Sequence, residues 1–519
     1  MDDSGSTTNE HSSGFIEAIQ AKLKEGQEQD LPVRDSLERI PLDEAPTDTR
    51  LVISFRDASR TMDCDDLRPW PTDKDIFTVQ QTPESTGPVL RQDHEPLCYF
   101  YFDPATDHIT LSHKCKGPVE VVDLAAGERR GVPPRQCAGI RPGCWRVYGP
   151  RGRGLVPEVL LDFRLLPRPY ATTIMERGGS GSKSSLLTAL CKARSVQHVP
   201  RGHIHPVEQL SLGQTLSIRP RSGSTSGHPD AAYTLKHVRT AAVKQTACVV
   251  IGHHSKLGRV AIKVVRREHE SDSRFVPSIA RHWADEKRFL ERLHHVRVAQ
   301  PCIVELLGAD ARLYALYLKV LPGKDLSQWV DTGHFFTCGS EGDANRTILR
   351  ISCQMTSAVA FLHKQARIVH NDIKPANIVA HLPRGTKVVD AKLIDFGHAS
   401  VVEATDCPGG TPWYMPFDGP NNQGPARDCW ALGVTLLFVM RAIPLPEKTQ
   451  PVWRIDQVLH DDIQAQLMRD WLAGIQDRRK ELGDGDIESF VHELLSPDAE
   501  ERCRYLRRLA RTLPLGSLT

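Results

Sequence analysis

The spacing of apolar residues changes twice along the chain, and each change restricts the fold that the chain can adopt. Between residues 50 and 170, short stretches alternate apolar and polar side chains, which is typical of β-strands with one buried face. We expect strands at Leu51–Phe55, Cys98–Phe102, His108–Leu111, Val119–Val122, Trp145–Tyr148 and Val159–Leu165. Turn-forming pairs such as Asp103-Pro104 separate them. Residues 49–170 are therefore predicted to form a small all-β, sandwich-like domain.

A second β-rich stretch starts near residue 210 and gives way to helices. Strands are predicted at Leu210–Ile218, Tyr233–Val238, Ala247–Ile251 and Arg259–Val265, the last two as a hairpin. A helical period follows from Ile279 to Leu293, and the pattern after Asp395 is mainly helical. Residues 231–515 are thus predicted to form a domain with a β-rich part and a helical part, so the fold class of the chain is α+β.

Two other segments have the composition of irregular chain. Residues 1–48 are rich in Ser, Thr, Asp, Glu and Pro, which predicts a disordered tail with one amphipathic helix at Gly14–Glu25. Residues 171–230 are predicted to be a flexible linker because Glu176–Ser185 and Arg219–Gly227 are rich in Gly and Ser. No glycine directly precedes Lys183, so this Gly/Ser-rich run lacks the pattern of a phosphate-binding P-loop.

Charge and cysteine content narrow the class of protein. A net charge of +2 argues against nucleic acid or a membrane as the main partner. The 13 cysteines form no C-x-x-C pair, which argues against a disulfide framework or a zinc site and favours a reducing compartment. The first residues lack the features of a signal peptide, and the longest apolar run, Ala431 to Met440, is too short to span a bilayer. We expect a soluble protein of the cytoplasm, the nucleus or both.

The run His370-Asn-Asp-Ile-Lys-Pro-Ala-Asn377 carries the clearest chemical signal in the sequence. It places the carboxylate of Asp372, the ammonium group of Lys374 and the amide of Asn377 on one loop. Together these groups can hold a hydroxyl, neutralise a phosphate and bind a metal ion, which is the set of tasks that phosphoryl transfer requires.

Further motifs in the same order and at the same separations make about 300 residues resemble a eukaryotic-type serine/threonine protein kinase. The resemblance implies the two-lobed protein kinase fold, with ATP and Mg²⁺ as cofactors and a protein as substrate. It assigns the catalytic roles to Asp372, which orients the substrate hydroxyl, and to Lys374, which neutralises the γ-phosphate. Thr411 would contact both side chains, and Asn377 would bind magnesium together with Asp395 of the Asp-Phe-Gly motif.

The resemblance also assigns residues that bind the nucleotide. Lys263 ends a Val-Ala-Ile-Lys run and would meet the α- and β-phosphates of ATP, while Glu286 would fix the position of the lysine. Leu318 takes the position of the gatekeeper residue. Lys319 and Leu321 would offer backbone groups to adenine.

The sequence departs from the family pattern at two functional segments. The stretch from Val238 to Thr246, where kinases have a glycine-rich loop over the phosphates, contains no glycine, which predicts weaker ATP binding or slower turnover. Asn371 replaces an Arg that usually pairs with a phosphorylated activation loop, so the chain resembles the kinases called non-RD. The activation loop, His398 to Gly409, is also short, and is called the activation segment below. We expect activity that does not depend on phosphorylation of Ser400 or Thr405.

Three charged residues of the helical part have structural roles in the family. Asp428 would brace the backbone of the catalytic loop. Asp418 stands where the family has a glutamate, and we expect it to pair with Arg502.

The N-terminal β-rich region loosely resembles a forkhead-associated (FHA) domain, as found in degenerate form beside kinases of filamentous fungi. The Gly-Arg, Ser-x-x-His and Asn-Gly signals for phosphothreonine binding are absent, so the main expectation is an accessory domain without such a site. Two alternatives to an active kinase stay open. One is a pseudokinase or scaffold with weak nucleotide binding, and the other is an adaptor that binds a phosphoprotein partner through the β domain.

Overall fold

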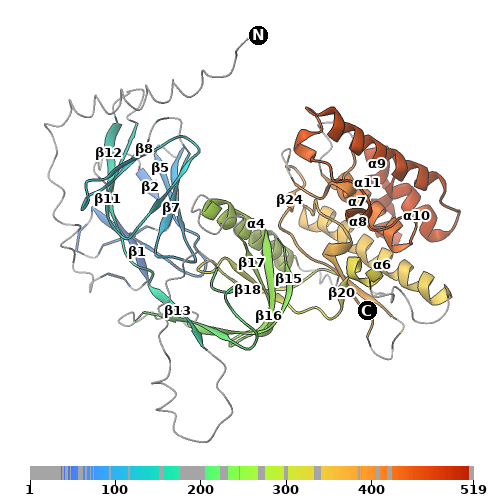
Figure 1. Ribbon diagram of the computed structural model, residues 1–519, viewed down its shortest axis with the longest axis horizontal. Coiled ribbons are helices and arrows are strands. Elements are labelled where there is room, and N and C mark those ends of the chain that lie inside the picture. The colour runs from blue at the N-terminus through green and yellow to red at the C-terminus, as the bar shows by residue number, and fades with distance from the viewer. Residues whose placement is uncertain are drawn as a thin grey trace, which may run out of the picture. The chain divides into compact units, whose positions relative to one another are not determined.

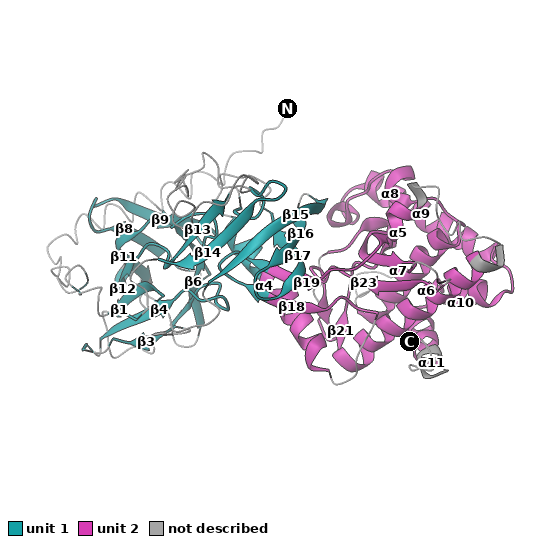
Figure 2. Ribbon diagram, turned by 90° about the horizontal axis from the view of Figure 1, so that it is seen from below, with its two compact units in different colours: residues 1–281, 309–315 teal, residues 282–308, 316–519 magenta. Residues whose placement is uncertain are grey.

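The computed structural model describes most residues between 37 and 512, and they divide into two compact units. The longest ranges outside the described part are 1–36, 56–61, 151–156, 176–204, 222–231, 267–274, 332–340, 418–423 and 513–519, so the helix expected at Gly14–Glu25 is not among the described residues. The first unit contains residues 1–281 and 309–315, and the second contains residues 282–308 and 316–519 (Figure 2).

The N-terminal part of the first unit consists of two antiparallel sheets that enclose one hydrophobic core (Figure 1). One sheet has the strand order β3-β4-β1-β12-β11-β8-β9 and the other β10-β7-β6-β5-β2. The strands are β1 (Thr49–Phe55), β2 (Met62–Cys64), β3 (Arg68–Pro69), β4 (Ile76–Gln80), β5 (Val89–Gln92), β6 (Glu95–Phe102), β7 (Ile109–His113), β8 (Val119–Asp123), β9 (Arg129–Val132), β10 (Cys137–Ile140), β11 (Gly143–Pro150) and β12 (Pro157–Leu165).

Each of the six strands expected between residues 50 and 170 overlaps an observed strand. The sequence missed mainly the short strands, such as β3 and β9, whose residues are largely exposed and carry no alternating apolar pattern. The core explains the agreement, because residues two apart on a strand, such as Leu51 and Ile53, point to the same buried face. Leu37 and Ile40, in the range predicted to be a disordered tail, pack against Val52.

A third antiparallel sheet includes, in this order, the strands β13-β14-β15-β16-β17 of the first unit. Its strands are β13 (Tyr170–Met175), β14 (Thr215–Pro220), β15 (Tyr233–Val243), β16 (Ala247–His254) and β17 (Gly258–Val265). The hairpin predicted around His253–Gly258 is confirmed by the pairing of β16 with β17. The range expected to be a linker carries β13 and β14 near its two ends, because these strands pair with each other over six residues and bury Leu216 and Ile218.

A tight turn near Arg312 contacts the N-terminal sheets within the same unit. The hydroxyl of Tyr314 donates to the carbonyl of Phe102 at 2.7 Å, and the hydroxyl of Tyr170 donates to the carbonyl of Arg312 at 3.0 Å. Arg312 is itself buried and pairs with Asp310 at 2.7 Å. These buried polar groups are therefore satisfied, and the turn is held against strands that are 142 and 212 residues away in sequence.

The second unit is mainly helical. Its elements are α5 (Leu326–Asp331), α6 (Glu341–Phe361), α7 (Pro425–Val439), α8 (Pro446–Thr449), α9 (Asp462–Lys480), α10 (Asp486–Leu494) and α11 (Ala499–Thr512), with the short strands β20 (Lys324–Asp325), β21 (Ile368–Val369), β22 (Ile378–His381), β23 (Asp390–Leu393) and β24 (Ser400–Val401). The helix α4 (Val276–His295) and the strands β18 (Leu306–Asp310) and β19 (Ala315–Lys319) contain residues of both units. The helix predicted at Ile279–Leu293 lies within α4.

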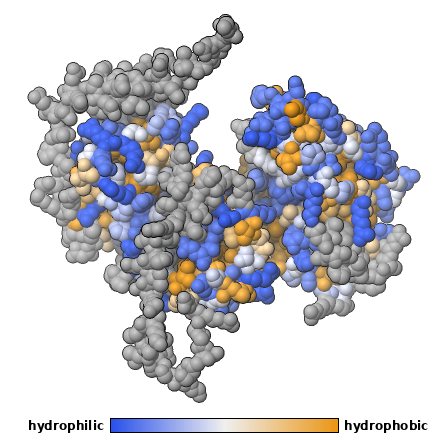
Figure 3. Space-filling model, in the orientation of Figure 1, coloured by the Kyte–Doolittle hydropathy of each residue, from blue (hydrophilic) through white to orange (hydrophobic). Residues whose placement is uncertain are grey.

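Helix α7 forms the centre of the second unit. Every residue from Ala426 to Val439 is buried, which explains why the sequence there is apolar on all sides. No helix of the described residues is long and apolar enough to cross a membrane. On the visible face in Figure 3, hydrophilic side chains predominate and apolar ones form separate patches.

Candidate active site

The loop His370–Asn377 connects β21 to β22, and one buried carboxylate anchors the backbone of the loop. Asp428, in the first turn of α7, accepts hydrogen bonds from the backbone N–H groups of His370 and Asn371, both at 2.8 Å. It also accepts a hydrogen bond from Nε2 of His363 at 2.8 Å. The bracing role predicted for Asp428 is thus confirmed by these contacts.

Hydrogen bonding keeps Asp428 ionised although it is fully buried. Burial alone would raise the pKa of its carboxyl group, but the hydrogen bond and charge of His363 and the backbone N–H of His370 together lower that pKa below its usual value. An ionised carboxylate is a stronger acceptor than a neutral one, so the backbone of the loop is fixed by charge-assisted hydrogen bonds.

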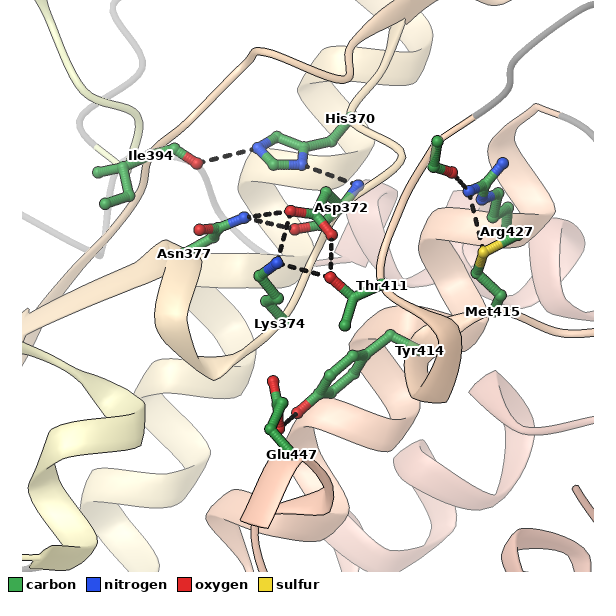
Figure 4. Close-up of polar contacts among 11 residues, drawn as sticks. His370, Asp372, Lys374, Asn377, Ile394, Thr411, Tyr414, Met415, Arg427 and Glu447 are labelled. Carbon is green, nitrogen blue, oxygen red and sulfur yellow. Dashed lines mark hydrogen bonds and ion pairs between the residues drawn. The ribbon is translucent and has the colours of Figure 1, made fainter. Parts of the chain in front are cut away.

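The carboxylate of Asp372 brings the predicted catalytic side chains together (Figure 4). The hydroxyl of Thr411 donates to one oxygen of Asp372 at 2.6 Å, and Nζ of Lys374 lies 2.8 Å from the other. Nζ of Lys374 also donates to the Thr411 hydroxyl at 2.6 Å. Nδ2 of Asn377 donates to the carboxylate and the carbonyl of Asp372, at 2.9 and 2.8 Å. Thr411 therefore joins the loop in one polar cluster, although it is 37 positions from Lys374 and 39 from Asp372 in sequence.

The buried side-chain oxygen of Asn377 is chemically suited to bind a metal ion. Its Nδ2 is used by Asp372, whereas its Oδ1 is buried and accepts no hydrogen bond from the described residues. A buried acceptor without a partner is costly, and a hard cation such as Mg²⁺ is suited to an amide oxygen. The N–H of Ile394 donates to the carbonyl of Asn377 at 2.9 Å, which brings the next residue, Asp395, close to Asn377 along the backbone.

His370 supports the loop from inside the protein. Its ring packs edge-on against the ring of Phe396, at 4.8 Å between centroids. Nε2 contacts the carbonyl of Ile394 at 3.1 Å, and Nδ1 accepts a hydrogen bond from the N–H of Asp372 at 3.3 Å. These contacts suit the neutral ring with its proton on Nε2. Burial lowers the pKa of His370, which favours the same form.

Asn371 does two things that the sequence pattern did not reveal. Its backbone is left-handed, with φ of 64°, a conformation that Asn tolerates better than most residues. Its Nδ2 donates to the carbonyl of His398 at 3.0 Å and to the hydroxyl of Ser400 at 2.9 Å. Strand β21 also pairs with β24. The start of the activation segment is therefore held by Asn371 and by strand pairing.

The end of the activation segment is held by Arg427, a residue that sequence reasoning did not single out. The guanidinium group of Arg427 is buried and donates to the carbonyl of Gly409. Gly410 has φ of 116°, and a side chain there would collide with Arg427 and with the carbonyl of Asn371. Tyr414 follows, and its hydroxyl donates to Glu447 at 2.9 Å. Only the position of Arg427, directly before Asp428, could have suggested a link to this segment.

The residues predicted to bind the nucleotide are distributed over both units. Lys263 is a largely buried residue of β17 in the first unit, and Glu286 is a buried residue of α4 in the second. Their pairing stays a prediction. Leu318 is buried in β19, while the backbone N–H of Lys319 donates to the carbonyl of Glu305 at 2.9 Å. The N–H of Lys319 is thus used, and Leu321 follows half-buried in the next turn.

The first part of the glycine-free stretch, Val238 to Val243, belongs to the long strand β15. Its pairing with β16 shifts register between His237 and Arg239 and again between Thr240 and Ala242. The side chains of Val238 and Val243 are exposed. Where the family has a glycine-rich loop, this chain has a bulged strand without the conformational freedom that glycine gives.

The structure describes only one residue, Arg502, of the ion pair expected between Asp418 and Arg502. Arg502 is fully buried, and its guanidinium group donates to the carbonyls of Ala426 at 3.2 Å and Ser496 at 2.7 Å. Asp418 lies outside the described residues, as does Thr405 of the activation segment.

A comparison with family models agrees with this geometry. The model of the protein kinase domain matches residues 245–511, about half of the chain. The chain belongs to the protein kinase family. The N-terminal β-rich region lies outside the matched range.

Distant relatives are named as serine/threonine kinases. Serine/threonine-protein kinase DCLK2 of Rattus norvegicus is 29% identical over 232 residues, which cover 42% of this chain and 26% of that protein. Serine/threonine-protein kinase GL21140 of Drosophila persimilis is 33% identical over 173 residues, covering 31% and 21%. The putative serine/threonine-protein kinase PRKY of Homo sapiens is 28% identical over 187 residues, covering 35% and 57%. The aligned part spans about a quarter or less of the first two relatives.

Proposed function

We propose that the chain is an active serine/threonine protein kinase that transfers the γ-phosphate of ATP to hydroxyl groups of a protein substrate. The observation that carries the proposal is the cluster in which Asp372 holds Lys374, Thr411 and Asn377 at hydrogen-bonding distance. Phosphoryl transfer depends mainly on positioned charges, and this cluster supplies a fixed anion beside a fixed cation.

The residues of the cluster have distinct roles in the proposed reaction. Asp372 would orient the substrate hydroxyl and accept its proton. The carboxylate oxygen of Asp372 that accepts a hydrogen bond from the Thr411 hydroxyl would do this. Lys374 would place its positive charge against the negative charge that develops on the transferred group. Asn377, through its free Oδ1, and Asp395 would hold Mg²⁺, which neutralises phosphate charge when bound.

The nucleotide would be held by residues assigned through the family resemblance. In this proposal Lys263 binds the α- and β-phosphates and Glu286 positions it, while Leu318 lines the adenine site. Because the N–H of Lys319 is already bonded to Glu305, Lys319 would offer adenine only its carbonyl group, and Leu321 would supply the other backbone contact.

We also propose that catalysis does not require phosphorylation of the activation segment. Asn371 holds the start of the segment through His398 and Ser400, and Arg427 holds its end through Gly409. These contacts keep the Thr411 hydroxyl hydrogen-bonded to Asp372 without a phosphate group on the segment.

The kinase domain is proposed to span residues 231–515, and an FHA-like accessory domain is proposed at residues 49–170. The arrangement of the N-terminal strands in two antiparallel sheets supports the second of these proposals.

The decisive experiment measures transfer of labelled phosphate from ATP with Mg²⁺ to a generic basic substrate protein. Wild-type chain is compared with the Asp395→Ala and Lys263→Met variants, and binding of ATP is measured on the same samples. Transfer above both variants supports the proposal. ATP binding without transfer would instead favour a pseudokinase or scaffold, the alternative that the missing glycines motivate.

A further inference from the structure

A short turn at residues 205–210 contacts the hairpin of β15 and β16, which stands where the family has its glycine-rich loop. The turn and the hairpin belong to the same unit. Glu208 of the turn pairs with Arg266, which directly follows β17, at 2.8 Å between Oε2 and Nε. Glu208 lies before the range that matches the kinase family, and the family resemblance assigns no role to either residue. The pair therefore needs an explanation of its own.

The turn that carries Glu208 is held by hydrogen bonds and by buried side chains. The N–H of Glu208 donates to the carbonyl of His205 at 2.9 Å. Nδ1 of His205 accepts from the N–H of Val207 at 3.1 Å, so Nε2 carries the proton and donates to the carbonyl of Leu313 at 2.6 Å. The side chains of Val207 and Leu210 are buried. Glu208 thus starts from an ordered backbone, and little conformational entropy is lost when it pairs.

Arg266 connects this turn to the tip of the hairpin. Nη1 of Arg266 donates to the carbonyl of Lys244 at 3.0 Å, and the backbone N–H of Arg266 donates to the carbonyl of Thr246 at 2.9 Å. The N–H of Lys244 donates to the carbonyl of Ala247 at 2.8 Å. The tip is therefore closed by its own backbone and held from one side by a guanidinium group.

The contacts of Arg266 also change the electrostatics of the tip. A carbonyl oxygen carries partial negative charge and repels a phosphate group, but the carbonyls of Lys244 and Thr246 are both occupied by N–H groups of Arg266. Glu208 accepts from Nε and Lys244 from Nη1, so the carboxylate does not compete for the N–H that reaches the hairpin. The side chains of Arg266 and Glu208 are only 29% and 15% exposed, which limits the screening of their attraction by salt.

We propose that Arg266 and Glu208 are positioning residues for ATP, which fix the hairpin of β15 and β16 where it covers the phosphate groups. Glycines would let a mobile backbone approach the phosphates. This chain instead holds a hairpin tip without glycine in one position. Arg266 acts through the carbonyl of Lys244, and Glu208 acts through Arg266. The proposal rests on the proposed function, because it concerns the hairpin of the same nucleotide site.

The test measures kcat and the KM for ATP in variants of the full-length chain. Glu208→Gln keeps the shape of the side chain but not its charge, and should raise KM about threefold to tenfold with kcat within about twofold of wild type. Arg266→Met also loses the bond to Lys244 and should raise KM about tenfold. The double variant should equal Arg266→Met, because Glu208 acts only through Arg266. Arg129→Met is the matched control, since Arg129 and Glu120 form an ion pair in the N-terminal sheets with side chains 39% and 17% exposed.

Hydrogen exchange in the ATP-free protein is the second readout and does not depend on activity. The amide of Lys244 should exchange about tenfold faster in Glu208→Gln than in wild type or in Arg129→Met. An unchanged KM overturns the positioning role, whether exchange becomes faster or not, and so does a higher KM with unchanged exchange.

A double variant whose effects are additive overturns the action of Glu208 through Arg266. Failure of the proposed function gives a different result. Wild-type protein that binds ATP without transferring phosphate refutes the proposed kinase activity, while the dissociation constant of ATP in the same variants still decides the role of the pair. Wild-type protein that binds no ATP refutes both proposals.

Discussion

The kinase family has a sequence motif both for the loop around Asp372 and for the hairpin of β15 and β16. This chain matches the motif closely in the loop and poorly in the hairpin. The loop retains Asp372, Lys374 and Asn377, and the side chain of Asp372 contacts those of Lys374 at 2.8 Å and Asn377 at 2.9 Å. The hairpin has no glycine between Val238 and Thr246, and a bulged strand stands in place of a loop. The difference shows that groups for phosphoryl transfer can persist where the segment expected above the phosphates has changed.

The two segments differ because one acts through side chains and the other through backbone groups. The loop acts through side chains of fixed chemistry, and a change of Asp372 or Lys374 removes a charge. The hairpin would act through backbone N–H groups, and its sequence affects only how closely those groups approach a phosphate. A sequence change in the hairpin is therefore expected to weaken the reaction by degrees rather than to abolish it.

The largest effect is expected for Asp372→Asn. The substitution keeps the shape of the side chain but removes the acceptor charge for Thr411 and Lys374 and the base for the substrate hydroxyl. We expect kcat to fall by about 10²- to 10⁴-fold, measured with labelled ATP at saturating concentration. The half-buried Asp461→Asn, at the start of α9 and far along the chain from the loop, is the control. A kcat within threefold of wild type would contradict the role of Asp372.

A smaller loss is expected for Thr411→Val, which has nearly the same volume. The variant loses the hydrogen bonds to Asp372 and from Lys374, although these two still pair at 2.8 Å. Since a hydrogen bond to a charged group contributes about 1.5–3 kcal/mol, kcat/KM should fall about tenfold to a hundredfold. Thr411→Ser keeps the hydroxyl and should stay near wild type. Equal losses in both variants would show that the hydroxyl is not what matters.

Stability should fall in mild acid because of the buried histidine of the loop. The pKa of His370 in the folded state is lowered from 6.5, so below pH 6.5 the unfolded chain binds a proton that the folded chain does not. This contribution is complete above pH 6.5 and is lost as pH falls through the folded pKa. The contribution of Asp428, whose pKa is also lowered, is lost at still lower pH.

The measurement is the free energy of unfolding from urea titrations between pH 5 and 8. His370→Gln should flatten the slope in this range, whereas replacement of the exposed His253 by Gln should leave it unchanged. An unchanged slope in His370→Gln would mean that other groups cause the acid sensitivity.

A modest gain is expected if glycines are restored in the hairpin. Ala241→Gly with Ala242→Gly should let the backbone approach the phosphates and lower the KM for ATP by about threefold, at a stability cost of roughly 0.5–1 kcal/mol for each glycine. Ala247→Gly, at the start of β16, has a similar cost without the gain. If KM is the same in all three proteins, the hairpin does not limit ATP binding.

The smallest effect is expected in the activation segment. Ser400→Ala combined with Thr405→Ala should leave kcat within about twofold of wild type, because the bonds of Asn371 to the His398 carbonyl and of Arg427 to the Gly409 carbonyl remain and need no phosphate. Phosphopeptide mapping of the wild type accompanies the assay. Loss of activity in the double variant would show that the segment depends on phosphorylation after all.

Local sequence patterns predicted the parts of this protein in which neighbouring residues determine the structure. Alternation along β1 and β6, the helical period of α4 and the order of the motifs from Lys263 to Asp395 needed no long-range information. The alternation follows from the two-residue repeat of a strand, because every second side chain meets the same core. The motif order predicted the family that the comparison with known proteins confirmed.

Only the tertiary structure decided which distant residues meet. Asn371 looked like the loss of an arginine, yet its left-handed backbone and its bonds to His398 and Ser400 give it a positive role. Two other hydrogen bonds likewise join distant residues. Arg427 donates to the carbonyl of Gly409, 18 positions away, and Tyr314 donates to the carbonyl of Phe102, 212 positions away. Such contacts depend on how whole elements pack, and packing is set by the shape of the assembled core rather than by any local pattern of residues.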